Sequence, residues 1–220
     1  MKKYLSISIA SILALSAPGI AKAQFSITAT IGGVPTVSGA SLENFDEPTP
    51  SILTLSGPAY LVTGTVTPEF NCAQPYFSGS TAAFFGESPT YGPDDSQYVA
   101  VCFDGSATLS FSTPQLYFGL LWGSVDTANT LTFYDSANNV IGSVSGYDIP
   151  IYYGDSGPSG TFYVNITSTT PFSSVVVSTP AANAFEFDDV AYAQVVPEPA
   201  SLSLLAVGMF GITLLRRHQR

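Results

Sequence analysis

The chain has 220 residues, and its six Lys and Arg and its one His all lie at the two ends, at positions 2, 3, 22, 216, 217, 218 and 220. Residues 24–196 therefore hold fifteen of the sixteen acidic side chains and no cationic one. This excludes nucleic-acid binding, which needs cations against phosphate. It also excludes Ser-His-Asp and Cys-His catalytic centres, and the usual His-rich catalytic zinc site.

The first residues have the three parts of a secretory signal peptide. Lys2 and Lys3 form a positive start, residues 4–17 are apolar, and Ala21-Lys22-Ala23 fits a small-x-small cleavage site. We therefore expect signal peptidase to cut after Ala23, so that the mature chain begins at Gln24. The alternative is an uncleaved N-terminal anchor.

The last residues combine a short motif, an apolar segment and a basic end. Pro197-Glu198-Pro199 is followed by the uncharged residues 200–215 and then by Arg216, Arg217 and Arg220. Sixteen helical residues span about 24 Å, slightly less than a hydrocarbon core of about 30 Å. The arginines are expected to stay in the cytoplasm, which places the preceding chain outside the inner membrane.

This end resembles the PEP-CTERM sorting signal of Gram-negative bacteria that make exopolysaccharide. The resemblance implies recognition of Pro197-Glu198-Pro199 by exosortase, a membrane-embedded enzyme, and removal of the helix. The protein would then reach the cell surface or the extracellular medium after a transient stay in the inner membrane. The alternative is a plain membrane anchor. The predicted domains are a signal peptide (1–23), an ectodomain (24–196) and a sorting signal with its transmembrane helix (197–220).

The ectodomain is predicted to be all-β. Short alternating or β-branched runs are separated by Gly, Pro, Ser, Asn and Asp, and residues 136–139 are typical of a hairpin turn. We expect an antiparallel, jelly-roll-like β-sandwich rather than an immunoglobulin-like fold. Residues 70–93 are expected to form a long loop tied at its base by Cys72. The predicted strands are 25–31, 60–66, 98–103, 107–111, 116–122, 130–134, 140–144, 161–166, 174–178 and 184–190.

Cys72 and Cys102 are the only cysteines. In an exported chain an even number of cysteines predicts a disulfide, with two buried thiols as the alternative.

Two segments resemble the core of a family of exosortase-dependent surface proteins. They are residues 118–134, beginning FGLLWGSVD, and residues 183–191, NAFEFDDVA. The resemblance supports the architecture and implies no particular activity.

Acidic residues near the two ends of the ectodomain are the metal candidates. Many jelly-roll carbohydrate-binding modules hold a structural calcium between their first and last strands, and that resemblance implies Glu43, Asp46 or Glu47 paired with Asp188 or Asp189. Carboxylates are the hard oxygen ligands that calcium prefers. The alternative is that these acids are solvated at a strand end. Strand alternation places residues 185, 187 and 189 on one face and 186, 188 and 190 on the other.

Other candidates are less specific. Asp94-Asp95 follows Gly92-Pro93 and is predicted to form a turn. Tyr152, Tyr153 and Trp122 could stack on a sugar, although aromatic rings of sandwiches commonly lie in the core.

We therefore expect a non-enzymatic surface or extracellular-matrix protein, processed by signal peptidase and exosortase and associated with exopolysaccharide. A carbohydrate-binding module, with or without calcium, is the alternative function. A glycoside hydrolase with paired carboxylates is a more distant one.

Overall fold

The structure is a computed structural model that describes residues 25–47, 50–64, 72–149, 157–180 and 184–194. The predictions for Ala21, Ala23 and Gln24, for Tyr152 and Tyr153, and for the segment 197–220 fall outside these ranges. Within them, no helix is long and apolar enough to cross a membrane.

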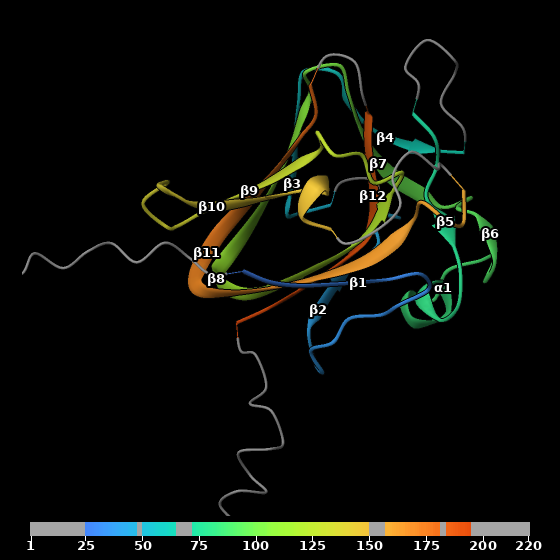
Figure 1. Ribbon diagram of the computed structural model, residues 1–220, viewed down its shortest axis with the longest axis horizontal. Helices are drawn as coiled ribbons and strands as arrows, with labels where there is room; N and C mark the ends of the chain where they lie inside the picture. Colours follow the sequence, from blue (N-terminus) through green and yellow to red (C-terminus); the bar gives the residue numbers. More distant parts are fainter. Residues whose placement is uncertain (1–24, 48–49, 65–71, 150–156, 181–183, 195–220) are drawn as a thin grey trace, which may run out of the picture.

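The described chain is built mainly of strands (Figure 1). In chain order the elements are β1 (Phe25–Thr30), β2 (Ser41–Glu43), β3 (Leu53–Ser56), β4 (Ala59–Thr63), β5 (Tyr76–Phe77), α1 (Thr81–Phe85), β6 (Gly92–Pro93), β7 (Gln97–Cys102), β8 (Ser106–Gly123), β9 (Thr130–Tyr134), β10 (Val140–Ser145), the 3₁₀ turn η1 (Gly146–Asp148), β11 (Phe162–Ser178) and β12 (Ala184–Ala193).

One ten-stranded antiparallel sheet folds over on itself to make both layers of the sandwich. Its central path runs β10-β9-β11-β8-β12-β7-β4, while β1 adds to β11, β2 to β12 and β3 to β8. The first half of β8 pairs with β3 and the end of β11, and its second half pairs with β12 and the start of β11. The prediction of an all-β antiparallel sandwich is confirmed.

The long strands β8 and β11 curve together around one corner of the molecule (Figure 1). Their ladder is interrupted between Thr167 and Phe172, opposite the exposed residues 112–114. Pro114 and Pro171 lie in these stretches, and proline cannot donate to a ladder. At this interruption each strand leaves one layer and enters the other. Each of the two long strands therefore contains two runs that the sequence predicted as separate strands.

The space between the layers is filled largely by aromatic rings. Phe133 packs edge-on against Phe118 at 6.0 Å and Phe172 at 5.1 Å, and Trp122 stacks on Phe185 with ring centroids 4.3 Å apart. All five side chains are fully buried. Burying each large apolar side chain contributes roughly 1.5–3 kcal/mol, so burial takes the place of the ion pairs that this domain cannot form.

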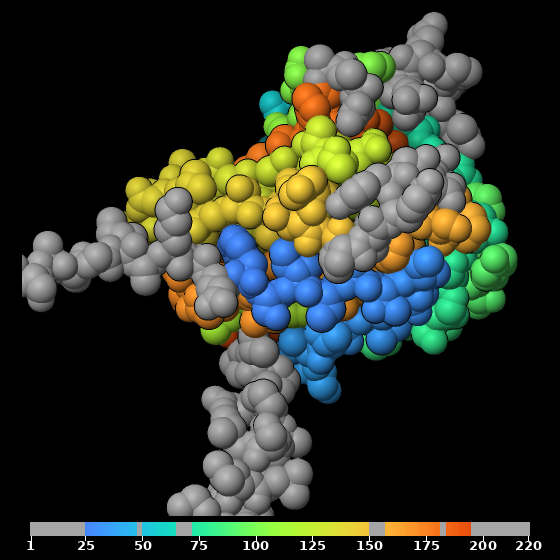
Figure 2. All heavy atoms as spheres, in the orientation of Figure 1, coloured from blue at the N-terminus to red at the C-terminus, as the bar shows by residue number. Residues whose placement is uncertain are grey.

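The first strand extends one layer of the sandwich at its edge. β1 lies antiparallel along β11, with Phe25 opposite Ser168 and Thr30 opposite Tyr163. In Figure 2 its blue residues form a band across the face of the molecule, beside the orange residues of β11. Alternate β1 side chains are half-buried, as the sequence pattern predicted.

Residues 72–93 are more ordered than the predicted long loop. They contain the pair β5–β6 and the short helix α1, which ends at Gly86 in a left-handed conformation (φ 82°). The loop prediction is therefore wrong for this stretch, because its two-residue strands are too short to leave a periodic pattern. Cys72 and Cys102 form a disulfide at its base, with an S–S distance of 2.09 Å.

Candidate functional site

A bulge in β12 places two consecutive aspartates in the interior. Asp188 pairs with Leu121 of β8, but the next ladder pair joins Ala191 to Gly119, so β12 holds one extra residue there. Asp189 takes a left-handed backbone conformation with φ 54°. Aspartate adopts this conformation more readily than most residues, and a left-handed residue is typical of one kind of bulge.

The bulge overturns the predicted alternation of β12. Val190 joins Phe185 and Phe187 in the main core, on the face that the sequence pattern had assigned to Asp189. Asp188 and Asp189 are both fully buried. A side-chain period of two holds only where the ladder is regular, and one extra residue exchanges the two faces.

Five acidic side chains from four parts of the chain meet beside this bulge, and we call them the carboxylate cluster. Its members are Asp46 after β2, Glu87 after α1, Asp94 after β6, and Asp188 and Asp189 of β12. Asp94, Asp188 and Asp189 are 0% exposed and Glu87 is 9% exposed, whereas Asp46 is exposed. The cluster thus reaches from the interior to the surface at Asp46.

Neutral donors connect the members of the cluster. The Asn44 amide donates to Asp46 Oδ2 (3.1 Å) and to Glu87 Oε1 (2.7 Å). The Ser96 hydroxyl donates to Asp94 Oδ1 and approaches Asp188 Oδ2 at 3.5 Å. Asp188 Oδ1 accepts the backbone N–H of Asp189 at 2.7 Å.

These donors leave three buried oxygens without a hydrogen-bond partner. They are both carboxylate oxygens of Asp189 and Oδ2 of Asp94. Burial raises the pKa of Asp189 well above its ordinary value, and the charges of Glu87, Asp94 and Asp46 raise it further. Burial raises the pKa of Asp94 too, although the contact with the Asp188 carboxyl group and the hydrogen bonds from Ser96 oppose that rise.

The remaining two buried members respond in the same direction. Burial raises the pKa of Asp188, and the neighbouring carboxyl groups of Asp189 and Asp94 add to the rise. Burial raises the pKa of Glu87 to about 7, against the lowering effect of its hydrogen bond with Asn44. The cluster therefore resists carrying its full negative charge at neutral pH.

The predicted metal residues are only partly brought together. Asp46, Asp188 and Asp189 belong to the cluster, whereas one Glu43 oxygen accepts the backbone N–H of Phe45 at 3.0 Å. Glu87 was not among the residues predicted from the sequence, and Asp94 was predicted to lie in a turn. Nothing in the sequence around Glu87 indicates that it belongs to an acidic site, because its position depends on how α1 packs.

A further buried acid, Glu186, lies in β12 two residues before Asp188. It is 1% exposed, its Oε1 accepts the backbone N–H of Ala73 at 2.9 Å, and its Oε2 has no hydrogen-bond partner. Burial raises the pKa of Glu186 to about 8. Its carboxyl group is therefore largely neutral at pH 7.

Trp122 is not available to a ligand. Its side chain is 0% exposed and stacks on Phe185 in the core. The prediction that Trp122 contacts a ligand is therefore wrong, and the alternative interpretation, a core aromatic ring, holds. Tyr152 and Tyr153 lie outside the described residues.

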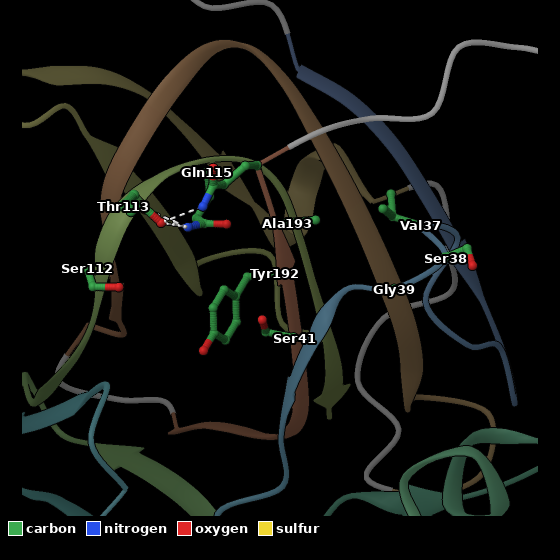
Figure 3. Close-up of a pocket in the computed structure, with 10 residues that line it drawn as sticks. Val37, Ser38, Gly39, Ser41, Ser112, Thr113, Gln115, Tyr192 and Ala193 are labelled. Carbon is green, nitrogen blue, oxygen red and sulfur yellow. Dashed lines mark hydrogen bonds between the residues drawn. The ribbon is translucent and has the colours of Figure 1, made fainter.

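A polar groove opens near the end of β12 (Figure 3). It encloses about 590 Å³ and contains one aromatic ring, that of Tyr192, which packs on Phe111 at 4.7 Å. In Figure 3 this ring lies between Ser41 and the part of β8 that carries Ser112 and Thr113. The lining residues are Val37, Ser38, Gly39, Ser41, Ser112, Thr113, Gln115, Tyr192, Ala193 and Gln194.

Amides and hydroxyls fix one wall of this groove. The Gln194 amide donates to Thr113 Oγ1 at 2.8 Å, and the Gln115 amide donates to the same oxygen at 3.2 Å. The residues that line the groove include no charged side chain. Such a surface can hydrogen-bond a neutral polar ligand and offers no opposite charge to an ionic one.

Comparison with known proteins gives one sequence match and several distant structural ones. Residues 195–218 match the family described as the PEP-CTERM protein-sorting motif. A search of curated proteins found no matching sequence.

Three solved structures are similar at low identity. The K2 cleaved adhesin domain of Lys-gingipain has a TM-score of 0.41 and 10% identity, with 70% of this chain and 99% of that one covered. A family 6 carbohydrate-binding module has a TM-score of 0.37 and 10% identity, covering 76% and 100%. The catalytic domain of Agl-KA has a TM-score of 0.35 and 15% identity, covering 73% and 29%. Similarities at this level do not identify a function.

The sequence match near the C-terminal end is therefore the comparison that bears on the role of the protein. It lies directly after β12, the last strand of the described domain. The motif implies export, a membrane-anchored sorting signal and processing by exosortase. This chain carries a PEP-CTERM protein-sorting motif at residues 195–218.

Proposed function

We propose that the protein is exported, released from its membrane anchor by exosortase, and acts outside the cell as a non-enzymatic surface or matrix protein associated with exopolysaccharide. The observation that carries this proposal is the sorting motif at residues 195–218. The domain before it has fifteen acidic residues and no cationic one. Such a charge keeps neighbouring copies soluble at high local concentration.

Neither the polar groove nor Glu186 is well placed for hydrolysis. A glycosidase needs two carboxyl groups facing a bound sugar about 5–10 Å apart. The lining residues of the polar groove include no carboxylate, and Glu186, whose raised pKa would suit an acid catalyst, is 1% exposed. These features favour a binding or structural role over catalysis.

Changing the sorting motif tests this proposal. In the producing cells we expect Glu198→Ala together with Pro197→Ala to leave most of the protein in the inner-membrane fraction, while the unaltered chain appears at the surface or in the medium. The reason is that exosortase can no longer recognise the motif. Immunoblotting of cell fractions makes the measurement.

A matched control is Glu47→Ala, which changes another Glu-Pro pair within the domain. It should be exported normally. An identical distribution of the motif variant and the unaltered protein would overturn the proposal.

A second candidate function is binding of a neutral polysaccharide in the polar groove. Tyr192 supplies an aromatic ring, and Ser, Thr and Gln side chains supply donors and acceptors without charge. Ligand sites commonly combine an apolar platform with a few well-placed polar groups. The charge of the domain also favours a neutral ligand over an acidic one.

We expect Tyr192→Ala to weaken retention on the producing cell's exopolysaccharide by about tenfold, which corresponds to roughly 1.4 kcal/mol. Affinity electrophoresis provides the measurement, with Tyr147→Ala as the control because Tyr147 is 75% exposed on η1, outside the groove. Gln194→Ala, at an exposed position, provides a second variant that does not disturb the core. Equal retention of all variants would remove this candidate.

A further inference from the structure

The carboxylate cluster has more buried oxygens than its donors can satisfy. Asp189 is 0% exposed with neither carboxylate oxygen hydrogen-bonded, and Asp94 is 0% exposed with Oδ2 unpaired. An ionised carboxylate buried without a partner is strongly unfavourable. Hydrogen bonds from Asn44, from Ser96 and from the backbone N–H of Asp189 reach other oxygens of the cluster and leave these three without a donor.

No side chain of the domain can supply the missing positive charge. Between Lys22 and Arg216 the sequence contains no Lys, Arg or His. The charge must therefore be removed by protons or balanced by a cation from the medium. Protons alone would have to be held by several neighbouring groups at once at neutral pH.

We propose that the carboxylate cluster is a calcium site, with Asp94, Asp188 and Asp189 as buried ligands and with Glu87 and Asp46 closing it toward the surface. One bound ion would then link the three segments that follow β2, α1 and β6 to β12. This site is independent of the polar groove and of the sorting motif, so its failure would leave the proposed function untouched.

The ligand chemistry favours calcium over other cations. Calcium takes six to eight oxygen ligands in irregular arrangements, with carboxylates bound through one or both oxygens. Magnesium demands a near-ideal octahedron and keeps several waters, and zinc prefers nitrogen or sulfur. The cluster offers only oxygen ligands, and Cys72 and Cys102 are joined to each other in the disulfide.

Binding requires the side chains of the cluster to rearrange. Within the described ranges, no three His, Cys, Asp or Glu side chains are already grouped as a metal-binding set. The Asp189 carboxylate can turn without breaking a hydrogen bond, because neither of its oxygens makes one. The exposed side chain of Asp46 gives an ion access from solvent.

Calcium titration of the full-length chain in detergent tests the site. After treatment with chelator at pH 7.5, we expect calorimetry to show saturable binding of one ion per chain. At about 100 times the dissociation constant the melting temperature should rise by roughly 5–10 °C. Sodium chloride of equal ionic strength should have a much smaller effect. An equal effect of sodium, or no saturable binding up to about 10 mM calcium, would overturn the proposal.

Asp189→Asn is the diagnostic variant, because asparagine also tolerates the left-handed backbone and removes only the charge. We expect calcium affinity to fall at least about tenfold and the melting temperature in chelator to rise, since an unpaired buried charge is gone. Asp104→Asn is the matched control: Asp104 is also left-handed (φ 64°) but lies exposed between β7 and β8.

The control should bind calcium like the unaltered protein. If Asp189→Asn proves too unstable to purify, Asp94→Asn tests the same loss of affinity from a different loop. Undiminished affinity in either folded cluster variant would contradict the assigned ligands.

Discussion

Replacing Trp122 by alanine should lower the free energy of unfolding by about 3–5 kcal/mol, the usual cost of removing a large buried aromatic ring. The Trp122 side chain is 0% exposed and stacks on Phe185 at 4.3 Å with an interplanar angle of 15°. It sits in the centre of the main core, opposite Phe162 on β11 and Phe187 on β12. Urea denaturation of the full-length chain in detergent makes the measurement.

Tyr147→Ala is the control for this prediction, because Tyr147 is 75% exposed. Its replacement should change the free energy of unfolding by less than about 1 kcal/mol. A loss below about 1 kcal/mol for Trp122→Ala would mean that the two layers do not pack as described. The outcome also separates the core role of Trp122 from the ligand role that the sequence suggested.

In chelator, the free energy of unfolding should fall as the pH rises from about 4.5 to about 8. Glu186 has a folded-state pKa raised from 4.5 to about 8 by burial. A raised pKa means that the folded state holds the proton more tightly, so this stabilisation is complete below the unfolded pKa and lost as the pH rises through the folded one. The shift of the Glu186 pKa corresponds to about 5 kcal/mol.

Glu186→Gln should flatten this pH dependence and make the protein more stable than the unaltered chain at pH 8.5. Glutamine keeps an oxygen for the backbone N–H of Ala73 and carries no charge. Denaturation curves between pH 4.5 and 8.5 give the result. The buried members of the carboxylate cluster, Glu87, Asp94, Asp188 and Asp189, shift in the same direction and will leave a residual slope.

Asp135→Asn provides a control of opposite sign. The pKa of Asp135 is lowered by hydrogen bonds from Asn139 and from the backbone N–H of Ala137 in the β9–β10 turn. Its charged form therefore favours folding, and Asp135→Asn should lower the free energy of unfolding at neutral pH.

The pH dependence of the unaltered protein has a contradicting outcome of its own. If its free energy of unfolding stayed flat or rose between pH 4.5 and 8.5, the burial of Glu186 and of the acids of the carboxylate cluster would be contradicted.

Most strands were predictable because they are regular. The β9–β10 hairpin, where Asn138 has φ 62°, follows directly from a turn of small residues and asparagines between two alternating runs. β8 and β11 were each predicted as two strands, because Pro114 and Pro171 look like ends when read locally. Only the pairing of both halves within one folded sheet shows that the chain bends there and continues.

The carboxylate cluster was predictable only in part. The run at Asp188-Asp189 pointed to an acidic site, and the absence of cations showed that its charge needed another partner. The bulge at Asp189 could not be inferred from a period of two, since one inserted residue leaves no mark on composition. Glu87 and Asp94 join the site through the packing of α1 and β6, which are too short to predict.

The measurement that tests the central claim most directly is the intact mass of the protein isolated from the surface or medium of the producing cells. The account predicts a chain that begins at Gln24 and has lost the segment beyond the Pro197-Glu198-Pro199 motif, including Arg216, Arg217 and Arg220. A chain that retains Arg220 wherever it is found would contradict processing by exosortase and reduce the motif to a plain membrane anchor.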